Sequence, residues 1–169
     1  MKFGVMSIDL KRLPLETCFR LAKLYGFDGI EIFGSRSHLY PYDCTQEVAE
    51  SILNYQSQYG IEVPMYTPNA INLPVCLCSS NASERKDGVS YYQQAIKVAK
   101  AIGAKRVLVV ADHPGYAISR KTAWKYLVDS MKQICEFAHG SDIEVTIEPL
   151  TPMESTVVTT VEDCLELIE

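Results

Sequence analysis

Short apolar runs alternate with amphipathic helical segments along the whole 169-residue chain. The apolar runs begin near residues 3, 28, 62, 105 and 143, so the pattern repeats about every 35 residues. A repeat of one strand and one helix at this spacing is typical of right-handed βαβ units in a parallel sheet. The sequence therefore predicts an α/β fold with five parallel strands.

The spacing of apolar residues, and the glycines and prolines that end helices and strands, give the expected extent of each element. We expect strands at 3–6, 28–33, 61–66, 107–111 and 143–147. We expect helices at 15–25, 45–60, 89–102 and 119–139, and a last one that starts near residue 160. The stretch 67–88 contains Pro68 and Pro74 among several polar residues and is predicted to be a loop.

Two architectures contain five such units. A complete doubly wound five-stranded sheet suits the length, whereas a (β/α)₈ barrel usually needs about 250 residues. A nucleotide-binding doubly wound fold is expected to carry a glycine-rich turn after its first strand, and residues 7–14 contain no glycine. An apolar helix also still runs at Glu169. We therefore favour a single partial barrel domain over residues 1–169, without strands six to eight.

The acidic balance of the chain excludes one large class of partner. Lys and Arg number 16 against 21 Asp and Glu, which gives a net charge of −5 and a pI near 5.3. Proteins that bind nucleic acid through its phosphates need a basic surface, so we expect no nucleic-acid partner. No apolar run approaches the roughly 18 residues of a membrane span, and residues 1–11 lack a signal-peptide core. We expect a cytoplasmic protein with no membrane partner.

The six cysteines are interpreted as reduced, structural thiols, because no secretory signal precedes them. Cys76 and Cys78 are the only close pair in the sequence. A zinc site would need a second pair or histidines at ligand spacing, and neither lies nearby.

Ligands of parallel α/β proteins bind beyond the carboxyl ends of the strands. The residues at those ends are Glu31, Tyr66 with Thr67, His113 and Glu148. Glu31 has an alternative as an ordinary cap or loop carboxylate. His113 stands beside a Pro-Gly turn, so it either fixes that turn or contacts a substrate or metal.

Glu148 gives the sharper signal. It abuts an apolar strand, where a carboxylate is costly unless it is solvated, paired or bound to metal. Pro149 then turns the backbone out of the strand, and Glu154 follows six residues after Glu148 in the same loop. Two carboxylates in one pocket suit a metal and a substrate hydroxyl. The alternative is two exposed loop acids. His38, in another loop, has no assigned role.

Several stretches of the sequence match one known family. They are 12–14, 26–32, His38, 66–68, 113–116 and, most specifically, 148–155, which reads Glu-Pro-Leu-Thr-Pro-Met-Glu-Ser. On these stretches the chain resembles the xylose-isomerase-like TIM-barrel superfamily of sugar isomerases and epimerases. The resemblance covers the whole chain, but only the N-terminal part of the family's barrel.

The resemblance implies a role for each matching residue. Glu148 corresponds to a ligand of the single divalent metal and to one of two acid/base carboxylates. Glu154 corresponds to a contact with a substrate hydroxyl, and His113 lines the pocket. Glu31 and Tyr66 are expected to bind the substrate from the neighbouring strand ends. The DNA-repair branch of the superfamily is disfavoured, because it needs a histidine where this chain has 66–68.

The reaction implied is 3-epimerisation of a ketose, such as a fructoselysine-like sugar amine, through proton abstraction and a metal-stabilised enediolate. The metal would be Mn, Mg, Co or a similar divalent ion at one site, which is incomplete here because its other ligands come from strands six to eight. We therefore expect this chain alone to be inactive and the full-length form to be a homo-oligomer. Aldose–ketose isomerisation, or a non-catalytic remnant or binding module, are the alternatives.

Overall fold

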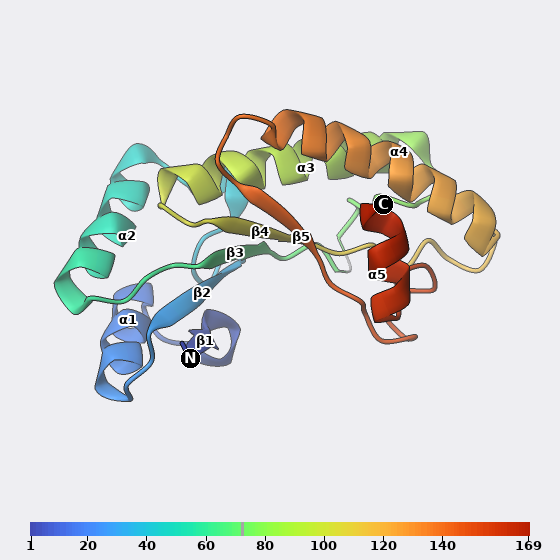
Figure 1. The fold of residues 1–169 in the computed structure, drawn as a ribbon. Helices are drawn as coiled ribbons and strands as arrows, with labels where there is room; N and C mark the ends of the chain where they lie inside the picture. The colour runs from blue at the N-terminus through green and yellow to red at the C-terminus, as the bar shows by residue number, and fades with distance from the viewer. Residues whose placement is uncertain (72) are drawn as a thin grey trace. The chain divides into compact units, whose positions relative to one another are not determined.

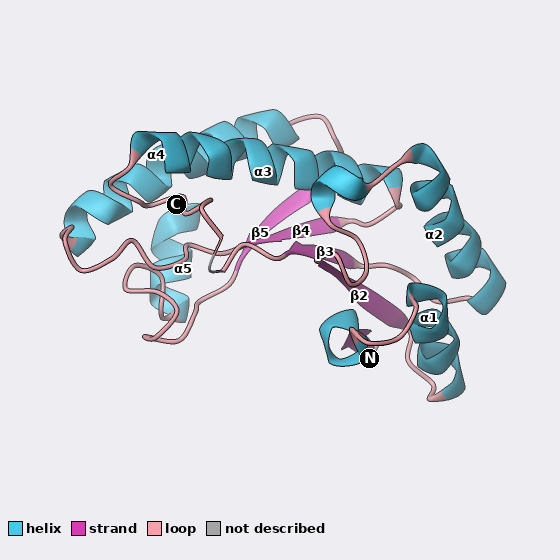
Figure 2. Cartoon of the chain, turned by 180° about the vertical axis from the view of Figure 1, so that it is seen from behind, coloured by secondary structure: helices cyan, strands magenta, loops and turns pink. Residues whose placement is uncertain are grey.

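The computed structural model describes residues 1–71 and 73–169, and its strands and helices alternate along the chain (Figure 1). The strands are β1 (Gly4–Met6), β2 (Gly29–Gly34), β3 (Met65–Pro68), β4 (Arg106–Val109) and β5 (Glu144–Ile147). The helices are α1 (Leu15–Leu24), α2 (Gln46–Tyr59), α3 (Ala82–Ala101), α4 (Arg120–Ala138) and α5 (Val161–Ile168). Short 3₁₀ turns follow β1 at Ser7–Leu10 and precede α2 at Pro41–Asp43 (Figure 2).

The strands pair in the order in which they occur in the sequence, β1-β2-β3-β4-β5. The pairs β1/β2, β2/β3 and β3/β4 are all parallel, with Met6 opposite Glu31 and Ile32 opposite Tyr66. A doubly wound sheet reverses its strand order at a switch point, and this sheet has no reversal. The doubly wound alternative is therefore wrong, and the first five strands of a barrel are confirmed.

The chain divides into two compact units, which are described separately here. The first unit comprises residues 1–69, 94–107 and 140–144, and the second comprises 70–93, 108–139 and 145–169. The division cuts through α3, β4 and β5. That residues 1–169 form one partial-barrel domain stays a prediction.

In the first unit α1 packs against β2 and beside α2 (Figure 1). The contact is apolar: Phe19 of α1 and Ile30 and Ile32 of β2 are fully buried. Because side chains alternate across a strand, burying Ile30 and Ile32 on the helix side places Glu31 on the other face of β2. The packing of α1 thus decides where this carboxylate lies.

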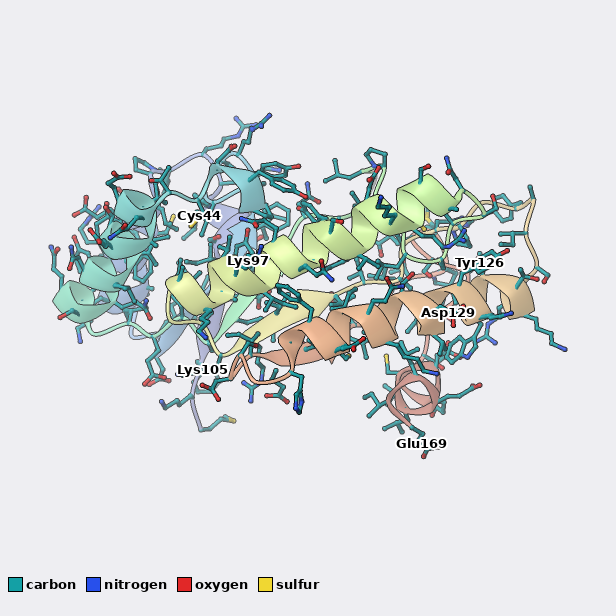
Figure 3. All side chains as sticks on the ribbon, turned by 90° about the horizontal axis from the view of Figure 1, so that it is seen from above. Cys44, Lys97, Lys105, Tyr126, Asp129 and Glu169 are labelled. Atoms are coloured by element: carbon teal, nitrogen blue, oxygen red, sulfur yellow. The ribbon has the colours of Figure 1, made fainter. Side chains whose placement is uncertain are left out.

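In the second unit α4 lies beside the first half of α3, as Figures 1 and 3 both show. A stripe of buried residues at helical spacing on α4, among them Leu127 and Ile134, confirms the predicted amphipathic pattern. On the outer side the Arg85 guanidinium of α3 lies 4.0 Å from the centre of the Tyr126 ring.

Two predicted boundaries are wrong. The first turns of α3 fall inside the predicted loop 67–88, because residues 82–87 are almost all polar and show no apolar stripe. The predicted loop also includes Asn72, which lies outside the described residues. The third strand starts at Met65 rather than near 61, because Pro64 has no N–H to donate. Only an isolated bridge between Gly29 and Glu62 precedes it.

None of the helices that the structure describes is both long enough and apolar enough to cross a membrane. Even α3, with 20 residues, carries four charged residues in its first two turns, Glu84, Arg85, Lys86 and Asp87.

Candidate functional site

In the first unit, Glu31 lies in the middle of β2 (Gly29–Gly34) and not at its carboxyl end as predicted, and it is close to Thr67 of β3. The Thr67 hydroxyl donates to Glu31 Oε1 at 2.5 Å. Thr67 is buried and Glu31 is half-buried. A short hydrogen bond of this kind fixes the direction of the carboxylate and leaves its second oxygen available to another donor.

Tyr66 lies next to Thr67 but is used differently. Its ring is fully buried, and its hydroxyl donates to the Leu39 carbonyl at 2.7 Å. The ring also fills the space where Gly34 has no side chain, since a Cβ there would come within 2.7 Å of the Tyr66 hydroxyl. Tyr66 therefore supports the loop after β2, and its contact with a substrate stays a prediction.

A second polar cluster in the first unit ties together the loops after β1 and β2. The Phe33 N–H donates to Ser7 Oγ at 2.9 Å, and Ser7 Oγ lies 3.0 Å from His38 Nδ1. His38 Nε2 lies 3.1 Å from the Leu13 carbonyl. Because a carbonyl only accepts, Nε2 carries the proton, and Nδ1 accepts from the Ser7 hydroxyl. Burial lowers the pKa of His38, which favours the neutral ring that this arrangement needs.

Sequence reasoning left His38 without a role and did not single out Ser7. The available signal was position, because Ser7 directly follows β1 at its carboxyl end, where ligands of parallel α/β proteins bind. The partnership itself joins residues 31 positions apart and could not be deduced from spacing.

In the second unit His113 fixes the turn that follows β4. The Gly115 N–H donates to His113 Nδ1 at 2.9 Å, so His113 helps to fix this turn, and its contact with a substrate or metal stays a prediction. Since Nδ1 accepts, the neutral ring carries its proton on Nε2. His113 Nε2 is buried and has no hydrogen-bond partner within the part of the chain that the structure describes. Leaving a buried donor without a partner costs free energy. Since Nε2 carries a proton, it can donate to an oxygen of a ligand but has no lone pair to offer a metal ion.

The residue before His113 is backbone-strained and tethered. Asp112 has φ 54°, in the left-handed region that non-glycine residues seldom adopt. Its carbonyl accepts from Ser155 Oγ at 2.9 Å, and Ser155 is fully buried. Ser155 adjoins Glu154, so this hydrogen bond ties the loop after β5 to the turn that carries His113. Strained residues of this kind cluster at ligand sites.

Glu148 directly follows β5, as predicted. Its N–H donates to the Val109 carbonyl at 3.2 Å, so the pairing with β4 continues one residue past the strand, and its side chain is exposed. Burial, followed by the charges of Asp163 and Glu148, raises the pKa of the Cys164 thiol. Glu148 thus lies within electrostatic reach of α5.

Glu154 is half-buried and closes its own loop. Its Oε2 accepts from the Thr151 hydroxyl at 2.7 Å and from the Thr151 N–H at 3.2 Å. The loop is therefore held in one shape, with Oε1 left for another donor. The structure brings the Glu154 loop and His113 into one unit, and Glu31 and Thr67 into the other. That the side chains of Glu31, His113, Glu148 and Glu154 all line one cleft stays a prediction.

The described residues do not by themselves hold a metal ion. Within 1–71 and 73–169 no group of three or more His, Cys, Asp or Glu side chains is arranged to bind one. A catalytic divalent ion needs several oxygen or nitrogen ligands. Glu148 could supply one of them, so the donor set in this chain does not fit a complete site.

Comparison with known proteins adds to this geometry. Residues 19–169 match the family model described as xylose isomerase-like TIM barrel. Over 168 residues the chain is 32% identical to fructoselysine 3-epimerase of Shigella flexneri, a match that covers 99% of this chain and 61% of that enzyme. The chain thus spans about three fifths of the length of this curated relative.

Solved structures agree on the fold. D-psicose 3-epimerase from Clostridium cellulolyticum, solved with D-tagatose, matches with a TM-score of 0.86 at 16% identity, over 99% of this chain and 59% of its own. The IOLI protein with a bound zinc atom matches with a TM-score of 0.79 at 18% identity, over 99% and 58% of the two chains.

Proposed function

Because the chain belongs to the xylose isomerase-like TIM-barrel family, we propose that it contributes strands β1–β5 to a site that epimerises a ketose at C3. A sugar amine of the fructoselysine kind is the proposed substrate. The similarity to fructoselysine 3-epimerase along 99% of this chain supports that choice. The observation that carries the proposal is the buried Nε2 of His113, which has no hydrogen-bond partner among the described residues. The backbone beside it is tied through Asp112 and Ser155 to the loop of Glu154.

Each residue has a distinct part in the proposed reaction. His113 Nε2–H donates to a sugar oxygen and orients the ketose. Glu154 accepts from a substrate hydroxyl through the carboxylate oxygen that Thr151 leaves available. Glu148, exposed at the end of β5, takes the proton from the carbon next to the carbonyl. A second acid, outside these five strands, returns a proton to the opposite face. Glu31, aligned by Thr67, accepts from a further hydroxyl.

The proposal includes a divalent metal ion only as an ion that Glu148 would help to bind. The Glu148 carboxylate would be one ligand, and the remaining ligands would come from outside the described residues. No step above depends on the ion.

A fusion protein tests the proposal directly. Residues 1–169 are joined to the part of the Shigella flexneri enzyme that the match does not cover. The fusion is incubated with fructoselysine and Mn²⁺ in D₂O, and proton NMR follows exchange at C3. We expect exchange at C3 together with epimerisation. A folded fusion that leaves the C3 proton untouched contradicts the proposal, and exchange confined to the C1–C2 positions points to aldose–ketose isomerisation instead.

A further inference from the structure

The side chains of Cys76 and Cys78, in the second unit, place their two thiols next to each other. Cys76 Sγ and Cys78 Sγ lie 3.5 Å apart, and neither is in a disulfide. Both sulfurs lie within hydrogen-bond distance of the same acceptor, the Ala111 carbonyl, at 3.7 Å for Cys76 and 3.0 Å for Cys78. A shared acceptor holds the two sulfurs on the same side of the backbone.

The backbone around the pair is clamped by two helices. On the α3 side, Gly88 packs so closely that a Cβ there would collide with the Val75 carbonyl. On the α4 side, Ser130 Oγ donates to the Leu77 carbonyl at 2.8 Å, and the Leu77 side chain is fully buried. The residues on either side of Cys76 are thus fixed, so the short distance between the sulfurs belongs to a rigid part of the unit.

The two thiols are chemically unequal. The hydrogen bond from Cys78 lowers the pKa of the Cys76 thiol, against the opposing effects of burial and of the charges of Asp112 and Glu84. The hydrogen bond to Cys76, with burial, raises the pKa of Cys78. Cys76 also keeps 4% of its surface exposed, whereas Cys78 has none exposed. We therefore assign Cys76 as the attacking sulfur, because the thiolate is the nucleophile.

We propose that Cys76 and Cys78 form an oxidation site, at which a hydroperoxide converts the dithiol into a disulfide within the chain. The Cys76 thiolate attacks one peroxide oxygen, the O–O bond breaks, and protonation of the leaving oxygen gives water or an alcohol. Cys76 is then a sulfenic acid. The Cys78 sulfur attacks it, the S–O bond breaks, and the leaving hydroxide takes the Cys78 proton as water. The two thiols are oxidised by two electrons and the peroxide is reduced by two.

Oxidation changes the segment that follows β4. The disulfide has no S–H, so the Ala111 carbonyl no longer has a thiol donor in a buried setting, which is unfavourable. Ala111 lies two residues before His113, whose turn depends on the same stretch of backbone. The site therefore links the redox state of the chain to the position of the His113 ring.

The test uses the 169-residue chain and hydrogen peroxide. Six thiols are titratable in denaturant before treatment, and we expect four afterwards, with a mass lower by two hydrogens, about 2 Da. Fragmentation mass spectrometry should place the bond between Cys76 and Cys78, and a thiol reductant should restore all six. Six persisting thiols, or a bond between any other two cysteines, overturns the proposal.

Variants identify the reacting pair. Cys78→Ser keeps a hydroxyl that can donate to Ala111, and it should leave Cys76 as a sulfenic acid that dimedone traps, with no loss of two hydrogens. Cys76→Ser should lose no thiol pair. Cys135→Ser is the matched control, because Cys135 is exposed and unpaired, and it should still lose two thiols. Loss of a pair in either Cys76→Ser or Cys78→Ser contradicts the assignment.

Discussion

The polar groups at the carboxyl ends of the strands are used differently in the two units. In the first unit the Ser7, His38 and Thr67 side chains are each donor or acceptor to a neighbour, and the network is half-buried or buried. In the second unit His113 keeps a buried Nε2 without a partner among the described residues, and Glu148 is exposed. A satisfied buried network mainly fixes geometry, whereas a buried donor without a partner is stabilised by a ligand. We therefore expect the Ser7 and His38 network of the first unit to hold shape, with Glu31 as that unit's contact with the substrate, and the second unit to carry out the proton transfer.

The largest expected effect is on Glu148. In the fusion protein, Glu148→Gln should lower the rate of C3 exchange by more than the ~10²–10⁴-fold typical of one general base, because the same side chain is proposed as a metal ligand. The matched control is Glu144→Gln, which removes the same charge at the start of β5, where Glu144 pairs with Arg106. Near-normal turnover and metal content in Glu148→Gln would contradict the role of Glu148 and make His113, in the same unit, the next candidate.

Ser7→Ala should destabilise the 169-residue chain more than the same substitution at an exposed serine does. The substitution leaves the Phe33 N–H and His38 Nδ1 without their partner, which costs about 1–3 kcal/mol. Urea unfolding followed by circular dichroism measures the change, with the exposed Ser37→Ala as control. An unchanged unfolding midpoint would show that the first unit does not depend on this network.

Tyr66→Phe should have a smaller effect of the same kind. It removes one hydrogen bond to the Leu39 carbonyl, worth about 0.5–1.5 kcal/mol, and keeps the ring. The exposed Tyr25→Phe is the control in the same unfolding experiment. If Tyr66→Phe instead raises KM in the fusion protein and leaves stability unchanged, Tyr66 contacts the substrate and is not a supporting residue.

The smallest effect is the pH dependence from His38. Its pKa is lower in the folded chain than the ordinary 6.5, so the unfolded chain binds more protons between the two values. The contribution of His38 to the free energy of unfolding is therefore complete above pH 6.5. It is lost as the pH falls from 6.5 through the pKa of the folded chain. His38→Gln should flatten this part of the stability profile, whereas the exposed His139→Gln should leave it unchanged. Identical profiles for wild type and His38→Gln would contradict the network.

Boundaries set by local chemistry could be predicted from the sequence. The second helix was expected over 45–60, and the structure has Thr45 as its N-cap, accepting from the Val48 N–H, and Gly60 as its C-cap. The last helix was expected from its acidic first turn, and Thr160 and Asp163 form a capping box there. The start of α3 was missed because its first turns lack an apolar face, and the start of β3 because Pro64 interrupts an otherwise apolar run.

The candidate site divides in the same way. The alternating pattern was enough to place His113 and Glu148 after strands β4 and β5, whereas Glu31 lies inside β2 and not at its end as predicted. The hydrogen bonds that hold the site could not be predicted from the sequence. Thr67 is 36 residues from its partner Glu31, and Ser155 is 43 residues from its partner Asp112. Such pairings depend on strand register and loop shape, which spacing along one sequence does not encode.

The sequential strand order has a consequence for how the chain reaches its fold. Each of the strands β2 to β5 pairs with the strand made just before it, so these four pairings join neighbouring parts of the chain. Pairings close in sequence keep the entropy cost of loop closure low and favour fast folding. The sheet can therefore grow one βα unit at a time as synthesis proceeds, and each new strand finds an edge already formed by its predecessor.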